Sequence, residues 1–142
     1  MKLNQELIKK FGKNISNNTK LSNFSWFNLG GPAEYFFKPD SKKQLIEFLR
    51  HNKKNQLEIT ILGAGSNTLI RDKGVSGVVI KLGPIFSEIK LVDKDVIEVG
   101  AATLDKKIAN FAQENGIADF EFLSCIPGSI GGSVIMNSGC YN

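Results

Sequence analysis

Two glycine-rich stretches are the part of this 142-residue chain best suited to binding an anion. The first covers residues 63–68 and follows the apolar residues 59–62, and the second covers residues 127–132 and follows residues 122–126. Glycine lets a backbone turn tightly and lets a phosphate come close to successive N–H groups. Each stretch also carries a serine hydroxyl. Together they predict a large phosphate-bearing ligand that is held at two points.

The first stretch matches neither of two common phosphate loops. A Rossmann fingerprint, G-x-G-x-x-G, would need glycine where Thr68 stands, and an acid about twenty residues further on. A Walker A loop, G-x-x-x-x-G-K-[ST], is not present either. We therefore expect a phosphate nest of a third kind, with an ordinary structural turn as the alternative. After the second stretch, residues 133–139 are small and apolar, and we expect a strand or the start of a helix beneath the ligand.

Apolar periodicity and turn residues predict the elements that position these stretches. The segment Pro39-Asp40-Ser41 is expected to stop a strand and cap a helix, and Thr103 to cap another helix, which Gly116 then ends. The polar residues 14–23 are expected to form a loop. Since runs of strand outnumber crossover helices, the predicted fold class is α+β. The predicted helices are 3–11, 41–52 and 103–115, and the predicted strands are 34–38, 57–62, 75–82, 85–92 and 96–101.

Apolar side chains at helical spacing also predict which helix faces are buried. The residues expected to face the core are Leu3, Leu7, Ile8 and Phe11 in the first helix, Leu45, Ile46 and Leu49 in the second, and Leu104, Ile108, Phe111 and Ala112 in the third.

Composition limits the classes of function. With 42% hydrophobic and 23% charged residues, the chain is typical of a soluble globular protein, and no apolar run approaches the roughly 20 residues of a membrane span. The N-terminus lacks the apolar segment of a signal peptide, so we expect a cytoplasmic protein. Cys125 and Cys140 are expected to form neither a disulfide nor a metal site. Because zinc needs about four ligands and His51 is the only histidine, we expect no structural zinc site.

The net charge of +4 has two interpretations. Lysine pairs such as Lys42-Lys43 and Lys53-Lys54 are typical of nucleic-acid surfaces, but no aromatic residues interleave with them. A solvated lysine-rich surface is the simpler interpretation, and a mild positive field also suits an anionic cofactor. We therefore expect no nucleic-acid partner.

The chain resembles a known family in three motifs that occur in the family's order. It is similar to the UDP-N-acetylenolpyruvoylglucosamine reductase (MurB) family, flavoenzymes that make UDP-N-acetylmuramate for bacterial peptidoglycan. The similarity extends from about residue 20 to the last residue. The motifs cover residues 24–33, 62–67 and 126–132, the last of which continues into residues 136–141.

The resemblance implies an FAD-binding PCMH-type fold of two α+β subdomains with FAD between them. An N-terminal helix and arm would cover residues 1–20, and the FAD-binding domain residues 21–142. Within it, residues 21–83 would form the first subdomain and residues 84–142 an incomplete second one, with the substrate-binding domain absent. FAD would be bound without a covalent link, since neither loop carries a histidine. The implied cofactor-binding residues are Gly63, Ala64, Gly65, Ser66, Asn67, Thr68, Pro127, Gly128, Ser129, Ile130, Gly131 and Gly132.

The resemblance carries over no catalytic residue. The family's substrate arginine, proton-donating serine and assisting glutamate would lie after Asn142, and Ser133 and Cys140 stand where the family commonly has alanine. The implied function is the FAD-binding portion of an NADPH-dependent oxidoreductase of cell-wall synthesis, acting on a nucleotide sugar but inactive as this chain alone. The alternative is a non-catalytic flavin- or nucleotide-binding module.

Overall fold

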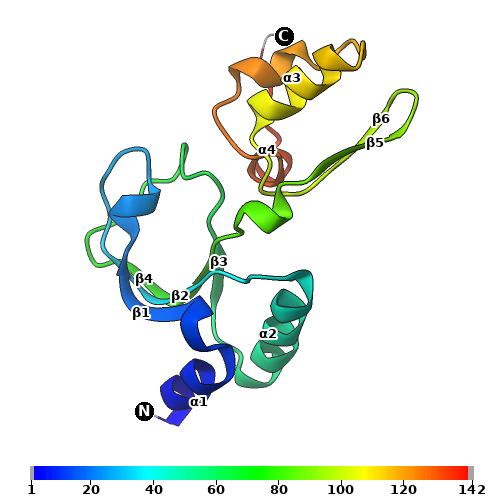
Figure 1. Cartoon of the computed structure of the whole chain (residues 1–142). Coiled ribbons are helices and arrows are strands. Elements are labelled where there is room, and N and C mark those ends of the chain that lie inside the picture. Colours follow the sequence, from blue (N-terminus) through cyan, green and yellow to red (C-terminus); the bar gives the residue numbers. More distant parts are fainter. Residues whose placement is uncertain (1, 141–142) are drawn as a thin grey trace. The chain divides into compact units, whose positions relative to one another are not determined.

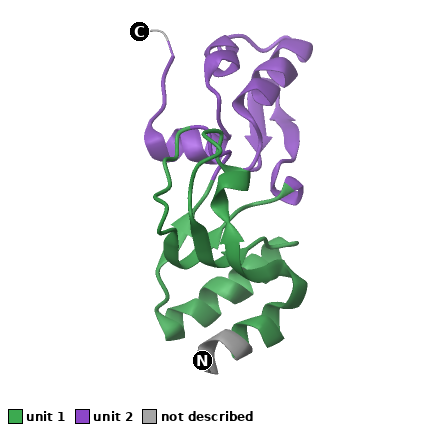
Figure 2. Cartoon of the chain, turned by 90° about the vertical axis from the view of Figure 1, so that its left-hand side faces the viewer, with its two compact units in different colours: residues 1–62, 67–83 green, residues 63–66, 84–142 purple. Residues whose placement is uncertain are grey.

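A computed structural model describes residues 2–140, with side chains from residue 6 onward, as two compact units (Figure 1; Figure 2). Unit 1 consists of residues 1–62 and 67–83, and unit 2 of residues 63–66 and 84–142. The segment 63–66 therefore belongs to a different unit from the residues on either side of it.

Unit 1 is built on a four-stranded sheet with the order β1-β2-β4-β3. β1 pairs antiparallel with β2, whereas β2, β4 and β3 are mutually parallel. The central register places Phe37 opposite both Ile15 and Ile80. The elements of unit 1 are α1 (Lys2–Phe11), η1 (Gly12–Asn14), β1 (Ile15–Lys20), η2 (Leu21–Phe24), β2 (Pro32–Phe37), α2 (Lys42–Asn55), β3 (Ile59–Ile61) and β4 (Val75–Ile80).

The alternation of side chains along these strands gives the sheet two apolar faces. One face packs against α1 and α2, where Phe48 is fully buried, stacks on Phe37 with 4.4 Å between ring centroids, and meets the edge of Phe11 (Figure 1). The other face carries Phe36 and Val79 and is covered by η2, whose Phe24 stacks on Phe36, and by the loop residues Leu62 and Ile70. Because both faces are covered, the parallel strands are apolar on both sides.

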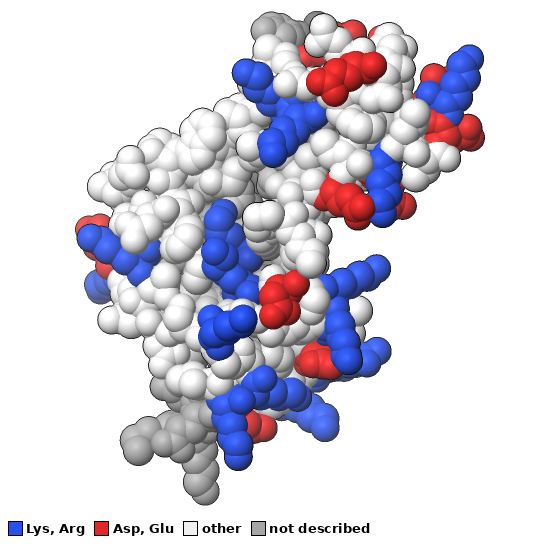
Figure 3. All heavy atoms as spheres, in the orientation of Figure 1, with Lys and Arg blue, Asp and Glu red and all other residues white. Residues whose placement is uncertain are grey.

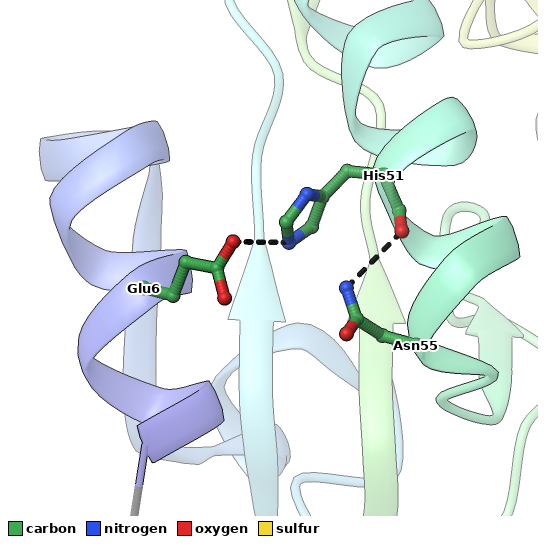
Figure 4. Close-up of polar contacts among 3 residues, drawn as sticks. All are labelled: Glu6, His51 and Asn55. Atoms are coloured by element: carbon green, nitrogen blue, oxygen red, sulfur yellow. Dashed lines mark hydrogen bonds and ion pairs between the residues drawn. The ribbon is translucent and has the colours of Figure 1, made fainter.

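A polar pair lies between α1 and α2 beside the aromatic cluster. His51 Nε2 lies 3.9 Å from Glu6 Oε1, and the two side chains point toward one another (Figure 4). His51 Nε2 is buried without a hydrogen-bond partner, and the Phe11 ring lies edge-on to the imidazole. Asn55 Nδ2 donates to the His51 carbonyl at 3.1 Å, which steadies the last turn of α2.

Unit 2 contains a hairpin and helices around a small core. Ile108, Ala109 and Leu123 form its buried apolar cluster, and α3 ends in a Schellman motif. In that motif Gly116 has φ +69°, its N–H donates to the Gln113 carbonyl, and the Ile117 N–H donates to the Ala112 carbonyl. The elements are η3 (Pro84–Phe86), β5 (Ile89–Asp93), β6 (Val96–Val99), α3 (Asp105–Glu114), η4 (Glu121–Cys125) and α4 (Ile130–Met136).

Much of the predicted element pattern is confirmed. The mixed content agrees with the α+β class, Ser41 caps α2 by accepting from the Gln44 N–H at 3.2 Å, and Gly116 ends α3 as expected. The strands predicted at 34–38, 57–62, 75–82 and 96–101 are all present in slightly shifted or shorter form. Residues 133–139 begin within the helix α4 and do not form a strand.

Two predicted segments are wrong, and both errors have local causes. The expected loop 14–23 contains β1, an edge strand that pairs with β2 and keeps mostly polar, exposed side chains. The expected strand 85–92 begins with a 3₁₀ turn, because the Ser87 N–H and hydroxyl both donate to the Pro84 carbonyl. The strand itself starts only at Ile89.

The expected cap of α3 is also wrong. Leu104, not Thr103, stands at the N-cap position, and no side chain caps the helix. The Thr103 carbonyl accepts from the Ile130 N–H at 2.8 Å, so this residue pairs with the segment before α4. Its hydroxyl is buried without a hydrogen-bond partner.

The buried face of α2 is rotated from the predicted one. Ile46 and Leu49 are 37% and 43% exposed, whereas Phe48 and Asn52 are buried and Leu45 packs against the core. Among the other predicted core residues, Leu7, Phe11, Ile108 and Ala112 are buried and Phe111 is partly exposed. Ile8 and Leu104 are exposed, and the side chain of Leu3 lies outside the described residues.

On the face that Figure 3 shows, basic side chains predominate in the lower part of the view, with some acidic ones among them. None of the described helices has both the length and the apolar character needed to cross a bilayer. Cys125 and Cys140 are not joined by a disulfide.

The packing of unit 1 predicts a steep contrast between neighbouring residues of α2. Phe48→Ala should lower the free energy of unfolding by about 3–5 kcal/mol, because it removes a fully buried ring. Leu49→Ala, at an exposed position, should change it by about 0.5 kcal/mol or less. Urea unfolding followed by circular dichroism measures both variants. Equal losses at the two positions would contradict the observed helix phase.

Candidate functional site

The two glycine stretches come together within unit 2. Residues 63–66 belong to this unit together with residues 84–142. A methyl group built on Gly63 would lie 3.1 Å from Ser129 Oγ and 3.9 Å from the Gly132 Cα atom. The two stretches therefore touch, although they are far apart in the chain. Asn67 and Thr68, predicted for the same site, belong to unit 1, where the Thr68 carbonyl accepts from the Ser25 hydroxyl at 3.3 Å.

The first stretch leaves the sheet of unit 1 at the carboxyl end of β3. Leu62 still pairs with β4 through an N–H···O bond of 2.9 Å to the Ile80 carbonyl, and the turn begins at the next residue. Gly65 is buried and has φ +77°, a conformation that side chains with a Cβ atom rarely adopt. Among the described residues, no acceptor takes a hydrogen bond from the N–H of Ala64, Gly65 or Ser66. These donors are available to an external anion.

The second stretch is fixed by main-chain hydrogen bonds to residues 101–105. The Ile130 N–H donates to the Thr103 carbonyl at 2.8 Å, and the Gly131 N–H donates to the Ala101 carbonyl at 3.0 Å. An antiparallel bridge joins Leu104 and Ser129, flanked by the Ile130 bond and by the bond from the Asp105 N–H to the Gly128 carbonyl at 3.2 Å. Two of the N–H groups in this stretch are thus occupied within the fold.

Three other N–H groups of the second stretch donate to no described residue, namely those of Gly128, Ser129 and Gly132. The backbone approaches residues 101–105 so closely that a methyl group on Gly131 would lie 2.8 Å from the Ala101 carbonyl oxygen. Only glycine fits such an approach without moving the backbone. The glycines of this stretch therefore have a packing role as well as any role in binding.

A buried polar cluster lies under the second stretch and was missed in the sequence. Asp105 is fully buried, and its Oδ2 accepts from the Ser133 hydroxyl at 2.6 Å. Asp105 Oδ1 and the Thr103 hydroxyl oxygen are buried without any hydrogen-bond partner. Burial raises the pKa of the Asp105 carboxyl above its usual value, and the hydrogen bond from Ser133 opposes this shift. An acid in the first turn of a helix ordinarily indicates a surface charge near the helix dipole, so the sequence held no clear signal of its burial.

A hollow in unit 2 is lined by none of the predicted site residues. It has a volume of about 270 Å³ and lies between α3 and η4, where Asn110, Gln113 and Phe120 are among its lining residues. In the part of the chain that the structure describes, no three histidine, cysteine, aspartate or glutamate side chains are grouped as metal ligands would be. The converging glycine stretches are accordingly the candidate site, and its chemistry is that of an anion cradle.

Comparisons with known proteins agree on one family. Residues 33–142 match the FAD binding domain family. The UDP-N-acetylenolpyruvoylglucosamine reductase of Pelagibacter ubique strain HTCC1062 is 50% identical over 141 residues, which cover 96% of this chain and 46% of that protein. The enzyme of the same name from Rickettsia canadensis strain McKiel is 50% identical over 121 residues, or 85% of this chain and 40% of that protein.

A solved structure gives the same result. The crystal structure of UDP-N-acetylenolpyruvylglucosamine reductase (MurB) from Thermus caldophilus aligns with a TM-score of 0.67 and 30% identity, covering 88% of this chain and 42% of that one. The chain thus spans less than half the length of each of these relatives.

The buried carboxyl beneath the second stretch predicts a specific pH dependence. Because burial raises the pKa of Asp105, the folded chain keeps this proton over a pH range in which the unfolded chain has released it. The stabilisation from this proton is therefore fully present below about pH 3.8, the ordinary pKa of the carboxyl. It is lost as the pH rises through the raised pKa, and above that pH the contribution of Asp105 to stability no longer changes. Asp105→Asn removes this titration. The free energy of unfolding of the variant minus that of the wild type should increase with pH across this range, as urea unfolding from acidic to neutral pH would measure. A pH-independent difference would contradict the prediction.

Proposed function

Because the chain belongs to the FAD binding domain family, we propose that it is the FAD-binding portion of a UDP-N-acetylenolpyruvoylglucosamine reductase. The observation that carries the proposal is the meeting of residues 63–66 with residues 129–132 in one unit, with unoccupied N–H groups on both stretches. The named relatives, of which the chain covers less than half, support the reaction of the whole protein. That reaction would reduce the enolpyruvyl ether of UDP-N-acetylglucosamine to UDP-N-acetylmuramate with NADPH, in the cytoplasm, for peptidoglycan synthesis.

The residues of the first stretch fit the pyrophosphate of FAD. Ala64, Gly65 and Ser66 offer consecutive N–H groups without a competing acceptor among the described residues, and the Ser66 hydroxyl is also without a partner there. Hydrogen bonds from neutral donors to a charged phosphate each contribute roughly 1.5–3 kcal/mol. The resemblance extends the FAD-binding assignment to Asn67 and Thr68, which belong to unit 1.

The second stretch divides into two roles. Gly128, Ser129 and Gly132 have N–H groups for the ligand, whereas Ile130 and Gly131 donate to residues 101–105 and so shape the loop. Pro127, which has no N–H, fixes φ where the stretch begins. Neither stretch contains a histidine or a cysteine, so the cofactor is held without a covalent link.

The two units correspond, in this proposal, to the two subdomains of the family fold. The change of unit after Gly83 supports the boundary between residues 21–83 and 84–142. When bound, FAD supplies the hydride chemistry, while the residues of this chain bind and orient it. We assign no catalytic residue to this chain.

Substitutions in the first stretch test the cradle. Ser66→Ala should weaken FAD binding at least about tenfold, because it removes a donor to a charged group. Gly65→Val should abolish binding, since a β-branched residue is strained at φ +77°. Gly83→Val is the matched control, because a Cβ at Gly83 meets open space and its φ is not positive. Titration of each folded variant with FAD, followed by flavin fluorescence, gives the dissociation constants.

The wild-type chain is titrated with FAD first. If it shows no binding, the assignment of FAD as the cofactor is refuted. If the wild type binds and Ser66→Ala binds equally well, the pyrophosphate does not lie at residues 63–66. Ser66 has no hydrogen-bond partner among the described residues, so loss of folding is not expected in that variant.

The chain alone should bind flavin without turning over substrate. A positioned general acid is typically worth about 10²–10⁴-fold in rate, and we place none within residues 1–142. A steady-state assay with FAD, NADPH and the enolpyruvyl sugar nucleotide should give no substrate-dependent NADPH oxidation. Turnover near that of an intact flavoenzyme would show that the catalytic groups lie inside this chain. A chain that binds FAD but not the sugar nucleotide is also consistent with the alternative of a non-catalytic flavin-binding module.

A further inference from the structure

Asp105 contacts both ends of the second glycine stretch. Its N–H donates to the Gly128 carbonyl at 3.2 Å, and its carboxyl accepts from the Ser133 hydroxyl at 2.6 Å. A methyl group on Gly128 would lie 3.0 Å from Asp105 Oδ2, so the carboxyl also lies directly against the start of the stretch. Asp105, at the beginning of α3, thereby bonds residues on both sides of the segment whose N–H groups have no acceptor among the described residues.

The burial of this side chain is unfavourable in itself. Asp105 is 0% exposed, and its Oδ1 has no hydrogen-bond partner. A buried polar atom without a partner costs free energy, and an apolar residue of similar volume would avoid that cost. An aspartate that merely complements the dipole of α3 would not need to be buried or to bond Ser133. Buried polar groups that lower stability in this way are expected at functional sites.

We propose that Asp105 is a positioning residue for the cofactor loop, holding Gly128 and Ser133 so that the N–H groups between them form one preorganised set. The inference rests on the proposed function, because the ligand that this set awaits is the FAD pyrophosphate. Asp105 acts through Ser133 and the main chain and does not itself contact the cofactor. Preorganisation of this kind strengthens binding by removing the cost of ordering the loop.

Three variants separate the hydrogen-bond role from the charge. Asp105→Ala removes the carboxyl, Ser133→Ala removes only the donor hydroxyl, and Asp105→Asn keeps an acceptor oxygen while abolishing the charge. Ser87→Ala is the matched control, because the Ser87 hydroxyl also donates a 2.6 Å hydrogen bond within unit 2, but to the Pro84 carbonyl. Urea unfolding of every variant identifies any that fails to fold, in which case Ser133→Ala, the smallest truncation, decides.

The first measurement needs no cofactor. Amide hydrogen exchange of Ile130 and Gly131 reports directly on the bonds to Thr103 and Ala101. Asp105→Ala and Ser133→Ala should each accelerate exchange at these two amides about tenfold, whereas Asp105→Asn and Ser87→Ala should stay within about threefold of the wild type. Exchange in β4, within unit 1, should be unchanged in all four.

The second measurement is the FAD dissociation constant of each folded variant. Asp105→Ala and Ser133→Ala should raise it about tenfold, and Asp105→Asn should restore near-wild-type affinity. The proposal is overturned if exchange at Ile130 and Gly131 is unaffected, if Asp105→Asn behaves like Asp105→Ala, or if the loop loosens while FAD affinity stays the same. If the wild type itself binds no FAD, the proposed function and the cofactor role fail together, and the exchange data then decide only whether Asp105 holds the loop.

Discussion

Each peptide N–H can donate one strong hydrogen bond, and this limit organises the candidate site. In the second glycine stretch the fold itself uses the N–H groups of Ile130 and Gly131, which anchor the stretch to residues 101–105. Those of Gly128, Ser129 and Gly132 remain, beside the similarly unused donors of residues 64–66. A site made of main-chain donors depends on backbone shape more than on side-chain identity, and the buried side chains beneath it are the ones that determine this shape.

The parallel part of the sheet in unit 1 fixes the residue after which the first glycine stretch begins. β4 is central and pairs with β2 on one side and β3 on the other, with apolar residues on both faces. β3 has only three residues, but the bond from Leu62 to the Ile80 carbonyl extends its pairing to the residue before Gly63. The first glycine stretch therefore starts from a fixed point at the carboxyl end of a parallel strand, where ligands commonly bind in such sheets.

The elements with strong local signals were predictable, and those decided by distant partners were not. Ser41 and Gly116 act through their own neighbours, so a capping rule suffices for both. β1 is polar because it is an edge strand, and only its pairing with β2 reveals it. The glycine stretches were recognisable because glycine has few other reasons to cluster, whereas the burial of Asp105 depends on a residue 28 positions away, Ser133. Phe48 was missed by one helical position because neighbouring leucine and isoleucine gave an equally regular stripe.

The contact between Gly63 and Ser129 joins positions separated by nearly half the chain. Closing so long a loop is entropically costly, and contacts of this kind form late and slow folding. The hairpin of β5 and β6, and α3 with its Schellman end, involve only near neighbours in sequence and can form earlier. During synthesis residues 63–66 leave the ribosome well before the segment against which they pack. The cradle is accordingly completed after these local elements, and a cofactor can recognise it only once α4 has been made.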